Sequence, residues 1–443
     1  MKETRNTIVR LLSNIGSRKE VEQYLKRFSS VESTRFAVVK VGGAILRDDL
    51  ENLVSSLSFL YRVGLYPIVI HGGGVQLNEA LDAEGIETER VDGMRVTSPE
   101  VLEVARKVFQ RENWRLVEAL EELGTRARPI PSGVFQADFM DEERFGLVGE
   151  VTDIDLDPIR SSIRSGHLPI LSSLGETPGG QILNVNADVA ANKLALRIEP
   201  FKIIFLTGTG GLLDNYGRII PSVNLAEDFD HLMNQDWVQG GMRLKIQQIN
   251  SLLNELPLSS SVSITNPEHL AKELFTHRGS GTLVRRGEQI LCHDGMDGVD
   301  RENLSELIAA CFGRPLTDNY FDKKSFYRTY VSESYRATAV LTQEGGIPYL
   351  DKIGVTEEAQ GEGLGGSIWL RMKDENPKLF WRSRVENPIN GWYFEEAQGS
   401  FRQGKWVVFW YGMESFEEMK QCVDTALDMP ETLLPREGGG GEA

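Results

Sequence analysis

Cysteine is scarce in this sequence, which has three among 443 residues, at Cys292, Cys311 and Cys422. The three lie far apart, show no metal-ligand spacing and are too few for a disulfide framework. A small disulfide-stapled fold and a cysteine metal centre are therefore excluded, and we expect a protein of the reducing cytoplasm.

Long apolar runs are also missing. The N-terminal stretch is broken by charges every few residues and lacks the apolar core of a signal peptide, so we expect no cleaved leader. No stretch reaches the ~20 apolar residues that a membrane span requires. The sequence therefore predicts a soluble protein with no membrane partner.

Positive charge is outnumbered, because Lys and Arg total 48 against 65 for Asp and Glu and the formal net charge is −17. Such a field repels nucleic acid and anionic lipid, so neither is an expected partner. A site for phosphate or carboxylate must then concentrate positive charge locally. This requirement directs attention to Lys and Arg beside Gly-rich turns.

Two common nucleotide-binding motifs are absent, the P-loop pattern GxxxxGK[ST] and a Rossmann GxGxxG between a strand and a helix. Other Gly-rich turns follow three apolar runs: VVKVGGAIL with Lys40, Gly42 and Gly43, IVIHGGGVQL with Gly72 and Gly73, and FLTGTGGLLD with Thr207, Gly208 and Gly210. Glycine permits close backbone approach, and N–H groups at the start of a helix bind anions. Each turn alone is equally an ordinary strand-to-helix connection, so only the set bears on function.

The length and the hydrophobic patterns predict two main domains. Residues 36–284 alternate short β-rich runs (FAVVKV, YPIVI, LPILSSL, KIIFLT, SVSIT) with helical patterns, which indicates an α/β fold with an open, mostly parallel sheet between helical layers. Residues 320–434 contain YRATAVLT, YLDKIGV, KLFWRSR and KWVVFWY with one strong helix over 363–375, which indicates a smaller α+β domain. We expect a helical extension at 1–35, a connecting segment at 285–319 and a frayed tail at 435–443.

Five motifs in the first domain, KVGG, HGGG, DGMRVT, LNVNAD and GGMRLK, occur in that order between Phe36 and Leu283. Their set resembles the amino acid kinase family, and within it the N-acetylglutamate kinases. The resemblance implies ATP as phosphoryl donor, with Mg²⁺ carried by the nucleotide and no metal site in the protein. It also implies N-acetyl-L-glutamate as the acceptor.

The same resemblance assigns roles to individual residues. Lys40 and Lys245 would neutralise the transferring phosphoryl group and the leaving phosphate, and Asp188 would hold both ammonium groups. Arg95 would bind the α-carboxylate of the substrate and Asn184 its amide. The nucleotide would contact Lys40, Gly42, Gly43, Thr207, Gly208, Gly210 and Lys245, and backbone N–H groups at Gly43 and Gly73, with Gly72 beside them, would meet the phosphoryl group and substrate.

Alternative readings remain for this set. Arg95 is equally suited to a surface salt bridge and Asp188 to a helix N-cap. The turn Thr207–Gly211 departs from the Ser-Asp-type turn of many kinases in the family, and some members fused to an acetyltransferase have lost kinase activity. Both lysines and Asp188 are present, which favours an active kinase.

A second signature lies in the run VTEEAQGEGLGGSIWLRM, after the strand YLDKIGV and at the start of a helix. Its Q-x-x-G-x-G pattern resembles that of GNAT-type acetyltransferases, in which a helix N-terminus binds the pyrophosphate of acetyl-CoA. The implied CoA-binding residues are Ile353, Val355, Gln360, Gly361, Gly363, Gly365 and Gly366. An ordinary turn is the alternative.

The flanking runs FWRSRVENPINGWYF and KWVVFWYG resemble the acetyltransferase domain of N-acetylglutamate synthases, over about 320–434. That resemblance implies that Lys352, Arg384 and Asn387 hold the carboxylates of L-glutamate and that Tyr393 protonates the departing CoA thiolate. The general base for the glutamate amine stays unassigned, and water is one candidate. Tyr393 equally suits an aromatic core, and Arg384 a structural ion pair.

Together the resemblances lead to the hypothesis of a bifunctional enzyme of arginine biosynthesis that acetylates L-glutamate and then phosphorylates the product. One rival is a synthase whose silent kinase domain binds arginine as a regulator, and another is an arginine-sensing scaffold with both sites degenerate. In related kinases, a helical N-terminal extension accompanies arginine inhibition, and this chain shows a helical pattern before Phe36. It therefore suggests a homo-oligomer, for which we expect a tetramer, with L-arginine as effector.

Overall fold

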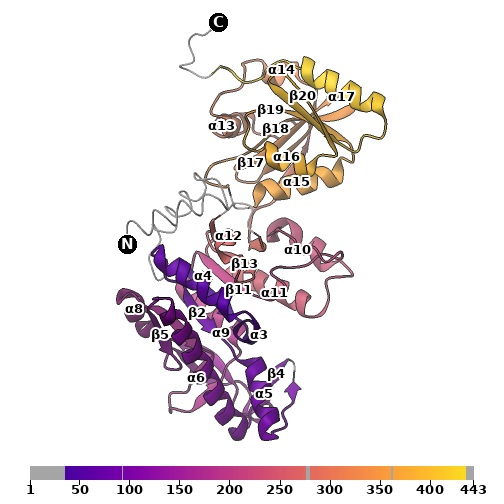
Figure 1. Cartoon of the computed structure of the whole chain (residues 1–443). Coiled ribbons are helices and arrows are strands. Elements are labelled where there is room, and N and C mark those ends of the chain that lie inside the picture. The colour runs from indigo at the N-terminus through magenta and orange to yellow at the C-terminus, as the bar shows by residue number, and fades with distance from the viewer. Residues whose placement is uncertain (1–34, 92, 276–279, 361–362, 436–443) are drawn as a thin grey trace. The chain divides into compact units, whose positions relative to one another are not determined.

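The computed structural model describes residues 35–435 except 92, 276–279 and 361–362. It divides into two compact units, the first of Met1–Val223 with Leu232–Arg286 and the second of Asn224–His231 with Gly287–Ala443 (Figure 1). The helices expected before Phe36 and nearly all of the expected tail lie outside the described residues. Among the described helices, none is long and apolar enough to cross a membrane.

The first unit is built on a sheet of eight strands among the described residues, in the order β12-β14-β13-β11-β1-β2-β8-β5. The bounds are β12 Ser222–Asn224, β14 Thr282–Arg285, β13 Ser261–Thr265, β11 Lys202–Leu206, β1 Ala37–Val41, β2 Ile68–His71, β8 Leu168–Ser172 and β5 Ala127–Ile130. From β13 to β5 each neighbouring pair is parallel, and β14 runs antiparallel to β13. The five strands expected from the sequence are confirmed in this sheet.

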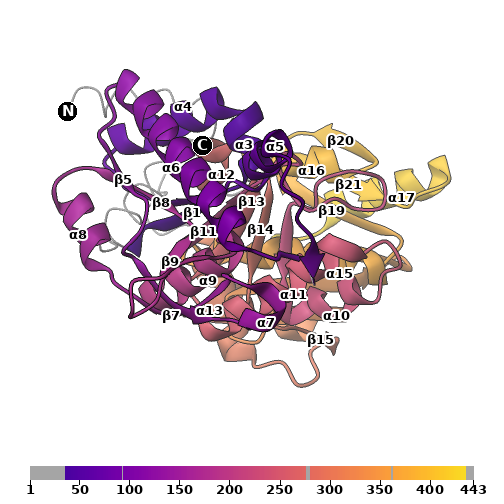
Figure 2. The ribbon, with the colours of Figure 1, turned by 90° about the horizontal axis from the view of Figure 1, so that it is seen from below.

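Both faces of the sheet are covered by helices, as the near-continuous apolar strands require. Val39 of β1 packs in a cluster with residues of α4 (Leu50–Arg62) and α6 (Pro99–Glu122), whereas Val38 packs with residues of α8 (Asp157–Arg164) and α9 (Ala187–Ile198). Neighbouring residues of a strand thus face opposite layers. Figure 2 shows α4 and α6 on one side of β1 and β11 and α9 on the other.

Two smaller elements of the first unit lie near the ends of these strands. One is the sheet β10-β9-β6-β7, made of Ile182–Asn184, Leu174–Glu176, Phe135–Phe139 and Gly149–Ile154. The other is the hairpin of β3 (Arg90–Val91) and β4 (Met94–Arg95). These elements were not expected from the sequence, yet they carry Asn184 and Arg95.

The second unit contains a sheet of seven strands within the described part of the chain, in the order β15-β16-β17-β18-β19-β21-β20. The bounds are β15 Ile290–Asp294, β16 Phe326–Ser332, β17 Ala337–Glu344, β18 Ile347–Val355, β19 Leu379–Arg384, β21 Trp406–Tyr411 and β20 Gly399–Gln403. The expected α+β class is confirmed, and the expected helix is α15 (Leu364–Glu375). Other helices of this unit are α13 (Arg301–Phe312), α14 (Tyr320–Lys323), α16 (Asn390–Glu396), α17 (Phe416–Asp428) and most of α10 (Leu225–Met233).

The segment 285–319, expected to connect the domains, is instead part of the second unit. All five residues of β15 pair with β16, and α13 buries Leu304 and Ile308 in a cluster with Tyr320 and Val340. Apolar and polar residues do not alternate in the strand ILCHD, so its sequence did not indicate a strand. It is recognised as a strand only from its pairing with β16. Residues 224–231 also fold with this unit, although they lie within the range expected for the first domain.

The two central strands of the second sheet diverge. β18 and β19 are parallel and pair only at Tyr349↔Phe380 and Leu350↔Trp381, although β18 continues to Val355. On its other edge β18 pairs with β17 along its length, with one bulge between Leu350 and Lys352. Beyond Leu350, the backbone of β18 is therefore not paired with β19.

Candidate active sites

The Gly-rich turns of the first unit meet at one edge of its sheet. β1, β2 and β11 are adjacent and parallel, so the turns that follow Val41, His71 and Leu206 leave from the same edge. Ligands of open parallel sheets bind outside the carboxyl ends of the strands. The motifs that lie far apart in the chain are therefore neighbours in the fold.

Three charged groups converge at this edge. The Lys40 ammonium lies 2.9 Å from a carboxylate oxygen of Asp188, which belongs to the first turn of α9. Burial lowers the pKa of the Lys245 ammonium, Lys40 lowers it further, and Asp188 opposes the change, so all three lie within electrostatic reach of one another. Lys245 comes from α11 (Gly240–Glu255) and lies 5.7 Å from the ring centroid of Phe205.

Asp188 is not the N-cap of α9. The cap is Asn186, whose side-chain oxygen accepts hydrogen bonds from the backbone N–H groups of Asp188 and Val189. The capping alternative for Asp188 is therefore wrong, and its carboxylate is left to pair with Lys40.

A cavity of about 350 Å³ opens beside the Lys40–Asp188 pair. Its lining includes Lys40, Gly42, Gly43, Gly72, Gly73, Arg90, Arg95, Asn184 and Asp188. Three of these residues are cationic and one is anionic, in a protein whose net charge is −17. This local excess of positive charge suits an anionic substrate.

Arg95 is 9% exposed, which excludes the surface salt bridge considered for it. Its guanidinium donates to Thr88 Oγ1 at 2.6 Å and to Asn78 Oδ1. Burial and the neighbouring Arg90 lower the pKa of Arg95.

Arg90 also lines the cavity, but it was not among the site residues expected from the sequence. Arg90 pairs with Arg95 across the β3–β4 hairpin, so the Asp-Gly dipeptide in the sequence RVDGMR is the signal that could have found it.

Asn184 is held beside Arg95 through one shared residue. Its Nδ2 donates to Thr97 Oγ1 at 3.1 Å, and the Thr97 hydroxyl donates to the backbone oxygen of Arg95 at 3.1 Å. Thr97 is fully buried, so this link is shielded from water. Asn184 and Arg95 therefore form one rigid wall of the cavity.

Two glycines of the cavity lie tightly against neighbouring side chains. A Cβ on Gly43 would lie 2.7 Å from Gln76 Oε1, and one on Gly73 would lie 2.8 Å from Phe109 Cδ1. Gln76 also donates from Nε2 to the backbone oxygen of Gly43 at 2.8 Å, which joins the two turns. The turns therefore bring backbone N–H groups to the cavity with no side chain in the way.

Of the residues expected to contact the nucleotide, Lys40, Gly42 and Gly43 line this cavity, whereas Lys245 and the turn after β11 do not. Thr207, Gly208 and Gly210 follow β11 at the same sheet edge but are not among the lining residues. The Thr207 and Thr209 hydroxyls lie 3.2 Å apart, and Gly210 has φ of +71°. Their role in nucleotide binding stays a prediction.

In the second unit, the expected CoA-binding residues gather where β18 ends and α15 begins. Gly363 precedes α15 with φ of +86°, and a Cβ on Gly365 would lie 3.1 Å from Val355 Cγ2. The start of the helix therefore lies against the part of β18 that carries Ile353 and Val355. Gln360 closes the preceding turn through its N–H to the oxygen of Thr356 at 3.0 Å. Gly361 lies outside the described residues, and Gly366 is in the first turn of α15.

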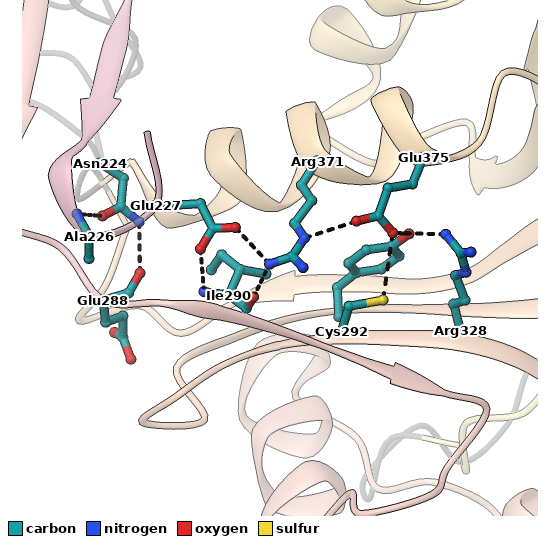
Figure 3. Close-up of polar contacts among 10 residues, drawn as sticks. Asn224, Ala226, Glu227, Glu288, Ile290, Cys292, Arg328, Arg371 and Glu375 are labelled. Atoms are coloured by element: carbon teal, nitrogen blue, oxygen red, sulfur yellow. Dashed lines mark hydrogen bonds and ion pairs between the residues drawn. The ribbon is translucent and has the colours of Figure 1, made fainter. Parts of the chain in front are cut away.

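The other end of α15 is anchored by charged contacts within the same unit (Figure 3). Arg371 donates to Glu227 at 2.6 Å and to Glu375 at 3.0 Å. Glu375 in turn accepts from Arg328 and from the Tyr330 hydroxyl, each at 2.8 Å. These bonds orient α15 relative to the sheet.

Tyr393 lies in an aromatic cluster, as its alternative reading anticipated. Its ring centroid is 5.5 Å from those of Trp381 and Phe409, and burial raises the pKa of its hydroxyl well above the ordinary value. The cluster also contains Trp369 of α15. Burial therefore keeps the Tyr393 hydroxyl protonated at neutral pH and also makes it a weaker acid, so its role as proton donor stays a prediction.

The three residues expected to hold glutamate are already engaged by the protein. Lys352 donates to Asp351 Oδ2 at 2.7 Å and to Thr432 Oγ1 at 2.6 Å. Arg384 donates to Glu431 at 3.0 Å, and Asn387 donates to Ser383 Oγ at 2.9 Å. The structure thus shows the ion pair considered for Arg384, and contact of these residues with substrate stays a prediction.

No group of three or more His, Cys, Asp and Glu that could hold a metal ion occurs among the described residues.

Family models match both units. The model of the amino acid kinase family matches residues 35–264, and the model of the N-acetyltransferase of N-acetylglutamate synthase matches residues 291–429. The second match begins at residue 291, within the segment 285–319 that was expected to connect the domains.

Curated relatives cover nearly the whole chain. An acetylglutamate kinase of Xanthomonas campestris is 56% identical over 95% of this chain and 100% of its own length. The mitochondrial N-acetylglutamate synthase of Homo sapiens is 32% identical over 94% of this chain and 76% of its own length.

Solved structures show the same fold. The N-acetylglutamate synthase of Neisseria gonorrhoeae, complexed with coenzyme A and N-acetyl-glutamate, has a TM-score of 0.58 at 19% identity and covers 89% of this chain and 98% of its own. The same synthase complexed with coenzyme A and L-arginine gives a TM-score of 0.55 at 18% identity, with the same coverage.

Proposed function

Because the chain belongs to the amino acid kinase family and carries the N-acetyltransferase domain of N-acetylglutamate synthases, we propose that it catalyses two consecutive reactions of arginine biosynthesis. The second unit would transfer the acetyl group of acetyl-CoA to the amine of L-glutamate. The first unit would transfer the γ-phosphoryl group of ATP, bound with Mg²⁺, to the side-chain carboxylate of N-acetyl-L-glutamate.

The observation that carries the kinase proposal is the convergence of Lys40, Asp188 and Lys245 beside a cationic cavity. The acceptor carboxylate is already a nucleophile, so no general base is needed, and the barrier is its repulsion from the phosphates. Two ammonium groups, kept in place by Asp188, reduce that repulsion and stabilise the charge of the transferring group.

The same cavity supports N-acetylglutamate as the acceptor. Arg95 and Arg90 would bind its α-carboxylate, and Asn184 would bind its amide, which leaves the side-chain carboxylate toward Lys40. The nucleotide phosphates would lie over the backbone of Gly42, Gly43 and the Thr207–Gly211 turn.

The acetyl transfer proposal rests on the divergence of β18 from β19 and on the glycine-lined start of α15. The pyrophosphate of CoA would bind the N-terminus of α15, and its pantetheine arm would pair with Ile353 and Val355 of β18. The neutral glutamate amine attacks the thioester carbonyl, the C–S bond breaks, and the thiolate receives a proton from Tyr393. In this scheme water takes the proton released by the amine, and Tyr393 regains a proton from solvent after the thiol leaves.

A paired variant test decides whether two independent sites exist. We expect Lys40→Ala to reduce acyl phosphate formation, trapped with hydroxylamine, by at least about 100-fold and to leave thiol release from acetyl-CoA unchanged. Tyr393→Phe should slow thiol release by about 10- to 1,000-fold and leave phosphorylation unchanged. Lys107→Ala, which removes an exposed lysine that pairs with Glu103, is the control. Loss of both activities in either variant contradicts the two-site proposal.

A synthase with a silent kinase domain is the second candidate, because the Thr207–Gly211 turn departs from the family pattern. It predicts thiol release without acyl phosphate in the unmodified protein. An arginine-sensing scaffold predicts arginine binding with neither reaction. Arginine as effector is supported by the arginine complex of the related synthase, and a homo-oligomer stays part of the proposal.

A further inference from the structure

The residues that follow α17 are hydrogen-bonded to other segments of the second unit. We define Met429–Leu434 as the C-terminal strap. Its Leu434 N–H donates to the oxygen of Pro315 at 2.9 Å, and its Thr432 oxygen accepts from the N–H of Thr317 at 3.0 Å. Arg382 donates to the oxygen of Pro430 at 3.0 Å. These bonds position two side chains of the strap.

The first of these side chains is Glu431. Its Oε2 accepts from Arg384 at 3.0 Å, and its Oε1 accepts from Lys405. The hydrogen bond from Lys405 lowers the pKa of Glu431, and the charges of Arg384, Lys405 and Arg314 act in the same direction. The Glu431 carboxylate therefore balances the positive charges of Arg384 and Lys405.

The second is Thr432, which completes the bonding of Lys352. The Lys352 ammonium donates to Thr432 Oγ1 at 2.6 Å, to Asp351 Oδ2 at 2.7 Å and to the Asp351 backbone oxygen at 3.2 Å. An ammonium has three N–H groups, so none remains for a substrate. Two residues expected to bind L-glutamate are therefore occupied by two consecutive residues of the strap.

The chemistry of this contact matches that of the expected substrate. The group on Arg384 is a glutamate side chain, and L-glutamate presents the same carboxylate. The Glu431 and Arg384 side chains are 41% and 33% exposed. Ions in solution can therefore reach the ion pair and replace one of its partners. An exposed ion pair of this kind is weak, which permits displacement.

From these contacts we infer that Glu431 is an internal substitute for a substrate carboxylate: it occupies the subsite formed by Arg384 and Lys405, and L-glutamate must displace it to bind. The inference rests on the proposed acetyl transfer and adds two residues to it. Lys405 becomes a further binding residue, and Glu431 becomes a competitor built into the chain.

The test is the affinity of the full-length protein for L-glutamate. Removal of an internal competitor raises the fraction of protein with an open subsite, and the apparent affinity rises in proportion. We expect Glu431→Gln to lower the KM for L-glutamate about two- to tenfold at saturating acetyl-CoA, with kcat within about twofold. Titration calorimetry with L-glutamate in the presence of CoA should show the same gain.

Glu386→Gln is the matched control, because Glu386 also faces Arg384, at 3.8 Å, but lies outside the strap. We expect its KM to stay within about twofold of the parent. Thr432→Val, which frees one N–H of Lys352, is the second variant and should also lower the KM.

Each other outcome overturns the inference. A higher KM for Glu431→Gln means that Glu431 holds Arg384 in place for the substrate, and an unchanged KM means that the subsite lies elsewhere. If the parent protein releases no thiol, the proposed acetyl transfer fails, but calorimetry still decides the inference. No heat with L-glutamate for parent or variant then rejects it.

Discussion

At the scale of single residues, burial decides what a titratable group does, and His71 is an example. It is fully buried at the end of β2, with Nδ1 3.2 Å from the oxygen of Gly72 and Nε2 3.1 Å from Nδ2 of Asn113. Nδ1 then carries the proton, because Nε2 must accept from the Asn113 amide. Burial lowers its pKa from 6.5 to about 4, so His71 positions the HGGG turn as a neutral side chain.

His71 should make stability depend on pH. Its pKa is lower in the folded state, so the folded form binds fewer protons and its stability is complete above pH 6.5 and lost as pH falls toward 4. We expect the free energy of unfolding of the first unit to fall by roughly 2 kcal/mol between pH 7.5 and 5.0. Denaturant titrations at both pH values should show this loss in the parent and in His231→Gln, an exposed control, and not in His71→Gln.

At the scale of elements, the position of α15 depends on contacts at both of its ends. Near its start, Gly365 lies so close to Val355 that a larger residue cannot be accommodated without movement. Toward its end, Arg371 joins it to Glu227, a residue 144 positions away in the sequence. The helix therefore holds its N-terminus close to β18, as the proposed binding of the CoA pyrophosphate requires.

Gly365→Val should separate α15 from β18 and weaken CoA binding. We expect the KM for acetyl-CoA to rise about 10- to 100-fold, because small displacements of binding groups have effects of that size. Acyl phosphate formation in the first unit should not change. Leu370→Ala, which truncates an exposed side chain of the same helix, is the control, and an unchanged KM in Gly365→Val would show that the glycine is not needed for CoA.

At the scale of the whole molecule, two units have separate cores and separate candidate sites. A ligand that binds one folded unit should stabilise that unit alone, by about 2.7 kcal/mol at 100 times its Kd. We therefore expect CoA to raise one calorimetric transition by about 5–10 °C and a non-hydrolysable ATP analogue with Mg²⁺ to raise the other. A single transition that responds to both ligands contradicts this expectation.

Much of this protein was determined by the sequence alone. Strands such as FAVVKV and KIIFLT are locally apolar, and Gly-rich turns follow them, so the α/β class was predictable from period and composition. The convergence of Lys40 and Asp188 was expected from the family resemblance alone, because Asp188 follows β10, which belongs to the smaller sheet and not to the parallel one. The pattern of residues 363–375 indicated α15 correctly.

Only the tertiary structure decided the features that depend on contacts distant in sequence. β15 has a weak local pattern and is recognised only by its pairing with β16, which corrected the expected connection at 285–319. By contrast, α13 carries Leu304, Leu307 and Ile308 at helical spacing before Gly313, a pattern that the sequence itself contains. Arg90 enters the cavity through a hairpin register, and Glu431 meets Arg384 across 47 residues. Local periodicity reports which face of an element is buried, but it contains no information on which distant side chain will lie opposite.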